Sequence, residues 1–161
     1  MIGNPYKFSV VFGKINDWNI DETFCNGFFL ICVDGIIYPK EIINTSLQRE
    51  ILIFKKKLQN LFIDDKLFNL PKENAFIEIY NLSFPKDQDI DNDYRFDITP
   101  ESFSDHDCFV FAVRSHNQVR IMASKLNYLT EDSRHDLECI NVSETMIEFD
   151  ELNKIITEIH M

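Results

Sequence analysis

Four aspartates at alternate positions form the clearest chemical pattern in the chain: Asp87, Asp89, Asp91 and Asp93. Carboxylate oxygens at this spacing are the ligands that a calcium loop offers to its ion. An EF-hand loop also requires a glycine at its sixth position and a glutamate at its twelfth, where this chain has Asn92 and Ile98. The pattern therefore predicts a solvated acidic loop or an acidic contact surface, and a weak cation contact is the less favoured alternative.

Histidine and cysteine occur close together twice, as His106 with Cys108 and as His135 with Cys139. These are zinc-binding residue types, but structural zinc sites normally show paired CxxC and HxxxH spacings, and the sequence contains neither. Buried thiols beside surface histidines explain the two pairs more simply. We therefore expect no metal ion and no other cofactor.

Asp105 and Asp107 flank His106, and a carboxylate beside an imidazole is an arrangement that orients a general base. However, the chain has no GxSxG nucleophile motif and no phosphate-binding glycine motif, and it contains only 4 glycines. The sequence thus favours a protein that is not an enzyme. Asp105 and Asp107 then become candidates for the same acidic contact surface as the aspartate loop.

The negative charge of the chain is concentrated in its C-terminal half. The formal net charge is −11 over 161 residues; residues 1–80 hold 9 Lys and Arg against 10 Asp and Glu, whereas residues 81–161 hold 7 against 17. Such a field repels nucleic acid and anionic membranes, and it accelerates association with a basic protein. An acidic surface that only keeps the protein soluble would give the same composition, so charge by itself leaves both interpretations open.

Three aromatic residues in polar surroundings are candidate anchors for a protein partner: Trp18, Tyr94 and Tyr128. Aromatic side chains carry much of the binding energy at protein interfaces because they bury a large area with few rotatable bonds. Each of the three would serve equally well in the core or at its edge.

The length and the hydrophobic patterning predict one α+β domain over residues 1–161, mainly antiparallel sheet with two main helices. Alternation over residues 6–15, an apolar run over 27–33, and 36–38 after Asp34-Gly35 predict a three-stranded meander. Helical spacing of apolar residues predicts helices over about 46–62 and 150–160. Thr45 and Gln48 fit a capping box at the start of the first helix.

The remaining apolar segments predict strands. Residues 108–114 and 119–126 fit a second hairpin, and residues 71–80, 94–98 and 137–142 fit further strands, the last extending toward Phe149. The run over 71–80 is also compatible with a short helix, because periodicity does not separate the two in a short apolar run.

The sequence also predicts where the protein works. No secretory signal begins the chain, no window is long and apolar enough to span a membrane, and 4 cysteines without a paired framework are typical of a reducing compartment. We expect a cytoplasmic protein.

Several blocks of the chain resemble a known family. They lie at residues 3–8, 26–39, 70–85 and 93–96, and they include Asn4-Pro5-Tyr6, Asp34-Gly35 and Tyr94-Arg95-Phe96. Together they resemble the immunity proteins of bacterial polymorphic and contact-dependent toxin systems, most nearly the immunity protein forty-two family. The resemblance implies a small cytoplasmic protein that binds and silences the cognate toxin's C-terminal domain, frequently a nuclease.

The resemblance and the charge together yield one hypothesis and one alternative. The hypothesis is an immunity protein that occludes a basic toxin surface through Asp87, Asp89, Asp91, Asp93, Asp105 and Asp107, with Tyr94, Tyr128 and Trp18 as anchors. The alternative is a non-catalytic module that binds a small ligand or a cation. Neither requires nucleic acid or a membrane as a partner, and nothing in the sequence calls for a homo-oligomer.

Overall fold

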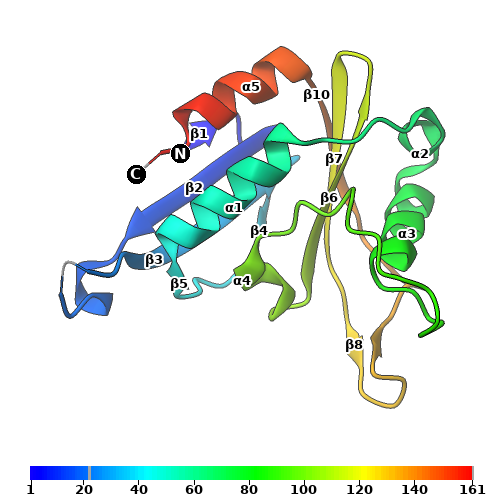
Figure 1. Cartoon of the computed structure of the whole chain (residues 1–161), viewed down its shortest axis with the longest axis horizontal. Helices are drawn as coiled ribbons and strands as arrows, with labels where there is room; N and C mark the ends of the chain where they lie inside the picture. The colour runs from blue at the N-terminus through cyan, green and yellow to red at the C-terminus, as the bar shows by residue number, and fades with distance from the viewer. Residues whose placement is uncertain (22, 161) are drawn as a thin grey trace.

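The computed structural model describes residues 1–21 and 23–160 and contains two antiparallel sheets and a short two-stranded ribbon (Figure 1). In the first sheet the strand order is β1-β2-β3-β4, and β5 pairs with the start of β3. Its strands are β1 (Ile2–Gly3), β2 (Phe8–Lys14), β3 (Asn26–Val33), β4 (Ile36–Tyr38) and β5 (Thr45–Ser46). The predicted meander is confirmed: β3 and β4 meet at Asp34 and Gly35, whose φ angles of 51° and 77° are those that a tight hairpin requires.

The second sheet is built around a long hairpin. Strand β6 (Cys108–Ser115) pairs along its full length with β7 (Gln118–Lys125), and β7 pairs in turn with β10 (Ser143–Glu148). The hairpin predicted from the two apolar runs is therefore confirmed. Strands β8 (Tyr128–Leu129) and β9 (Arg134–His135) form the separate ribbon between β7 and β10.

Helices α1 (Leu47–Gln59) and α5 (Phe149–Glu158) cover the first core, as the helical spacing predicted. Helix α1 buries Leu47, Ile51, Phe54 and Leu58, each one turn from the next. The predicted capping box is wrong. Ser46 is the residue at the helix start, and Thr45 belongs to β5, so its hydroxyl donates a hydrogen bond to Glu50 instead.

Both faces of the β6–β7 hairpin are buried, which explains why its strands read as nearly continuous apolar runs. Alternate side chains such as Val110, Ala112 and Ile121 enter the first core, with the first sheet, α1 and α5. Their neighbours, including Phe111 and Met122, enter a second core. Short α2 (Asp65–Asn69) and α3 (Lys72–Ser83) close this second core on the opposite side of the hairpin (Figure 1).

The segment predicted as a strand over residues 71–80 is helix α3, so that prediction is wrong. Ala75, Phe76, Ile79 and Tyr80 recur at helical spacing and all are buried in the second core. Pro71 stands at the helix start, where a missing N–H costs nothing. The α+β class is confirmed, and α3 and two shorter helices, α2 and α4 (Glu101–Ser104), are added to the two predicted helices.

Two further strand predictions need correction. Residues 94–98 form no strand of their own, although Asp97 makes an isolated bridge with Phe111 and the buried Phe96 and Ile98 follow the edge of β6. The last strand begins at Ser143 and not at Leu137. Residues 137–142 are irregular because Leu137, Ile140 and Val142 pack into the second core without strand spacing.

Arg120 on β7 ties α2 to the second sheet. Its side chain is buried at 2% exposure, and Nη1 donates to the carbonyl oxygens of Leu67, Phe68 and Leu70 at 3.3, 2.8 and 2.7 Å. Nε and Nη2 meet the carboxylate of Glu144 on β10. One guanidinium thus satisfies carbonyls at the end of α2 and pairs with the neighbouring strand.

The buried thiol of Cys108 predicts a loss of stability at high pH. Burial raises its pKa from the usual 9.0 to about 11, so from pH 9 upward the unfolded chain ionises before the folded one. The contribution of the neutral, buried thiol to the free energy of unfolding is therefore complete below pH 9, and it is lost as pH rises to 11. We expect the stability advantage of the wild type over Cys108→Ala to fall by about 2–3 kcal/mol across this window, as measured by urea unfolding. An advantage that is constant with pH would contradict the prediction.

Within the described residues, none of the helices has the length and apolar character required to cross a membrane.

Candidate functional site

The loop that follows α3 and the β8–β9 ribbon form one end of the molecule, at the lower right of Figure 1. We call this the acidic end and define it as residues 86–94 and 128–138. Side chains hold its two parts together: Arg134 Nη2 donates to the carbonyl of Phe84 at 3.3 Å, and the Phe84 and Tyr94 rings meet edge to face at 5.9 Å. The second core therefore positions both segments.

The aspartate loop orders itself through its own backbone. Asp87 accepts a hydrogen bond from the backbone N–H of Asp89 at 3.0 Å, and its carbonyl accepts from the N–H of Ile90. This turn leaves Asp89 and Asp91 exposed, and neither makes an ion pair with any described residue. Their carboxylates are available to a partner.

Asp93 has a different role from its neighbours. Both of its carboxylate oxygens accept hydrogen bonds from Arg95, and its backbone N–H donates to the carbonyl of Leu82 at 2.8 Å. The bonds from Arg95 hold the pKa of the Asp93 carboxyl below its usual range. Asp93 thus closes the loop against α3, and its charge is already balanced inside the chain.

Apolar side chains lie beside the exposed carboxylates. Tyr94 is 52% exposed and Ile90 58% exposed. Ile90 also lines a pocket of about 360 Å³ with Leu82 and Pro85, and the carboxylates of Glu78 and Asp91 line the same pocket. An exposed aromatic and aliphatic patch rimmed by charge is the usual composition of a protein-binding surface.

Asp107 orients His135, not its sequence neighbour His106. Asp107 Oδ1 lies 2.8 Å from His135 Nε2, and His135 Nδ1 lies 2.7 Å from the hydroxyl of Tyr80 on α3. Burial raises the pKa of Tyr80, which remains a neutral hydroxyl that can donate to the imidazole. Asp107 therefore fixes the ribbon to α3 and β6. No nucleophile among the described residues joins this chain of hydrogen bonds.

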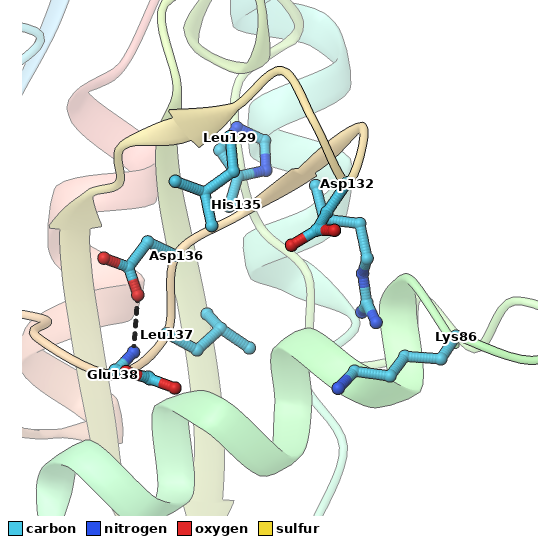
Figure 2. Close-up of a pocket in the computed structure, with 8 residues that line it drawn as sticks. Lys86, Leu129, Asp132, His135, Asp136, Leu137 and Glu138 are labelled. Atoms are coloured by element: carbon cyan, nitrogen blue, oxygen red, sulfur yellow. Dashed lines mark hydrogen bonds between the residues drawn. The ribbon is translucent and has the colours of Figure 1, made fainter.

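His135 also lines a pocket of about 630 Å³ between the aspartate loop and the ribbon. Figure 2 shows that its walls come from Lys86 on the loop and from Asp132, Asp136 and Glu138 on the ribbon side. The carboxylate of Asp136 accepts from the backbone N–H of Glu138 at 2.8 Å. Arg134 lines the same pocket, so its walls carry three carboxylates against the two cations of Lys86 and Arg134.

Sequence reasoning missed the acidic residues that the ribbon contributes: Glu131, Asp132, Asp136 and Glu138. Their density between residues 131 and 138 is visible in the sequence. Their proximity to the aspartate loop is not, because it depends on where the ribbon folds back onto α3.

Two of the predicted contact residues, Trp18 and Asp105, do not lie at the acidic end. Trp18 is half-buried in the short helix η1 (Asn16–Trp18), on the β2–β3 connection at the opposite, left-hand side of Figure 1. Asp105 follows α4 (Glu101–Ser104) and lines a separate pocket with Glu50 and His106. Tyr128, at 49% exposure, does lie on the acidic end, edge to face with His135.

Carboxylates, histidines and cysteines do not converge on a metal site in the part of the chain that the structure describes: no group of three or more is placed to hold one ion. The alternate aspartates of the loop are directed to its own backbone, to Arg95 and to solvent.

The sequence matches one protein family, and the fold is similar to that of a solved structure. The profile of the family described as Immunity protein 42 matches residues 1–161. Among solved structures, the chain is similar to CdiI from Burkholderia dolosa AUO158, with a TM-score of 0.78 and 19% sequence identity over 98% of this chain and 96% of that chain. At this identity the likeness shows a shared fold. No curated protein matches the sequence significantly.

Proposed function

This chain belongs to the immunity protein 42 family, and from that premise we propose that it binds and neutralises one cognate toxin domain in the cytoplasm of the cell that makes both. The function is inhibition by binding, without catalysis. The resemblance of the fold to a CdiI protein supports the same role, because a similar chain serves in contact-dependent inhibition.

The acidic end is the surface that we propose for toxin binding. It combines two exposed carboxylates that make no ion pair within the described residues, at Asp89 and Asp91, with exposed apolar side chains, at Ile90 and Tyr94. The carboxylates steer a basic partner and set the orientation, and the apolar side chains supply binding energy when they are desolvated. This combination of charge and exposed apolar area is the observation that carries the proposal.

A nuclease is the toxin class that fits this surface best. Enzymes that bind the phosphates of nucleic acids use basic surfaces, and a partner with clustered carboxylates can cover such a surface in place of the substrate. The concentration of negative charge in residues 81–161 supports this assignment.

Calorimetry with the C-terminal domain of the large protein encoded next to this chain tests the proposal. We expect a one-to-one complex that blocks toxicity and whose affinity falls as salt rises from about 0.05 to 0.5 M, because salt screens exposed charges. Tight binding without salt dependence would contradict the role of the acidic end but would still support the inhibitory function. No binding, together with a thermal shift from a metabolite or Ca²⁺, would favour the small-ligand alternative.

A further inference from the structure

The separate pocket that Asp105 lines is remote from the ribbon and lies where β5 leads into α1, beside α4. Its volume is about 310 Å³. Five ionisable side chains line it: Arg49, Glu50, Glu101, Asp105 and His106. Such a volume is at the small end of the range for ligand sites, so it suits one side chain better than a cofactor.

Glu50 is the unusual member of this pocket because it is a buried carboxylate, at 2% exposure. One oxygen accepts a hydrogen bond from the hydroxyl of Thr45 at 2.7 Å. The other has only the backbone N–H of Ser102, at 3.5 Å, which is too long for a strong hydrogen bond. No cation lies within 4.0 Å of it in the described part of the chain. Burying a carboxylate with so few donors costs folding free energy.

The guanidinium that lines the pocket, that of Arg49, is already paired. Arg49 Nε and Nη2 donate to the two carboxylate oxygens of Glu101 at 2.6 and 3.0 Å. With Asp105 exposed at the rim, the pocket therefore has three carboxylates against one guanidinium. His106 Nδ1 lies 3.9 Å from another carboxylate, that of Glu41.

The excess negative charge favours the binding of a cation, and the arrangement of the side chains determines which kind of cation fits. No group of three or more carboxylate, imidazole or thiol side chains is arranged to hold a metal ion within residues 1–21 and 23–160. A guanidinium or ammonium on a long side chain can instead reach through the opening at Asp105 and donate to the weakly bonded oxygen of Glu50.

We propose that this pocket, which we call the Glu50 pocket, receives one arginine or lysine side chain of the toxin. The proposal rests on the function proposed above and adds a second contact, separate from the acidic end. The Glu50 carboxylate is then a preformed partner: it is only 2% exposed in the free protein, so binding removes little further solvent contact from it.

Two variants test the pocket. Glu50→Gln keeps the shape of the side chain and its bond from Thr45 but removes the charge, and we expect at least about tenfold weaker toxin binding. Asp105→Lys, at an exposed site, places a competing ammonium at the opening and should weaken binding similarly. Glu158→Gln, an exposed loss of the same charge on α5, is the matched control and should bind like the wild type. Urea unfolding should show Glu50→Gln to be at least as stable as the wild type, because it removes a buried charge.

A probe that does not depend on the toxin keeps the two proposals distinguishable. Titration of the labelled wild-type protein with argininamide should shift the NMR signals of the Ser102 and Thr45 amides saturably, and Glu50→Gln should abolish the shift. Toxin binding by the wild type with unchanged affinity in Glu50→Gln and Asp105→Lys would overturn the pocket and leave the immunity role intact. Absence of a saturable argininamide shift would also overturn it, whereas a shift without toxin binding would support the pocket and contradict the proposed function.

Discussion

Replacing Arg120 with methionine is expected to lower the free energy of unfolding by about 3–5 kcal/mol, as measured by urea unfolding followed by circular dichroism. Methionine fills much of the buried volume but donates no hydrogen bond. The carbonyl oxygens of Leu67, Phe68 and Leu70 would lose their common donor, and Glu144 would keep a charge without its partner. Arg120→Lys should recover little of the lost stability, because an ammonium lacks the planar guanidinium that donates both to the carbonyls and to Glu144.

Arg49→Met is the matched control for Arg120, because it removes a two-point arginine–glutamate pair that is exposed. Exposed pairs contribute at most about 1 kcal/mol, so this variant should remain close to wild-type stability. A second check is Arg120→Met combined with Glu144→Leu, which should be more stable than Arg120→Met alone because no unpaired carboxylate remains. Equal losses in the Arg49 and Arg120 single variants would contradict the role assigned to Arg120.

Reversing two charges in the aspartate loop is expected to slow association with the toxin domain by about 10–100-fold at low salt. In Asp89→Lys with Asp91→Lys the fold should persist, since both side chains are exposed and neither is engaged in an ion pair in the described part of the chain. Stopped-flow association at several salt concentrations measures the effect. The difference from the wild type should shrink as salt rises, because the steering field is screened.

The control for charge reversal changes the net charge by the same amount elsewhere. Asp17→Lys with Glu158→Lys alters exposed acids on η1 and α5, away from the acidic end. It should slow association far less. If both double variants slow association equally, net charge alone governs the encounter, and the acidic end has no special part in it.

The elements that the sequence predicted correctly are those whose signal is local. The β3–β4 turn at Asp34-Gly35 and the hairpin of β6 and β7 join neighbouring strands, so turn chemistry and apolar runs define them. Helices α1 and α5 each bury one stripe against the first core, and that stripe appears in the sequence at helical spacing.

The wrong predictions concern segments whose structure depends on the second core. Residues 71–80 form a helix whose buried side chains pack against Phe109 and Phe111 on the β6–β7 hairpin. The spacing of apolar residues in the sequence does not reveal this packing surface. The hydrogen bond between Asp107 and His135 joins residues that are 28 positions apart, and it depends on the return of the ribbon. Because this partner is distant in the sequence, the sequence alone predicts that Asp107 is a carboxylate available for contact.

Among the proposed contact residues, Asp89, Asp91 and Tyr94 remain candidates for direct toxin contact, and Asp87 supports them by ordering the turn. Asp93 is balanced by Arg95. Sequence patterns show which residue types are present, but the distinction between a carboxylate that is free and one that is engaged needs the positions of the neighbouring donors.

The β6–β7 hairpin, whose alternate side chains serve different cores, also has an evolutionary consequence. The loop after α3 and the ribbon depend on the second core, whereas the first sheet, α1 and α5 depend on the first. Substitutions at exposed positions of the acidic end, such as Asp89 and Asp91, can therefore change that surface while both cores keep their packing. Under the function proposed above, such changes alter the toxin contact without a change in either core.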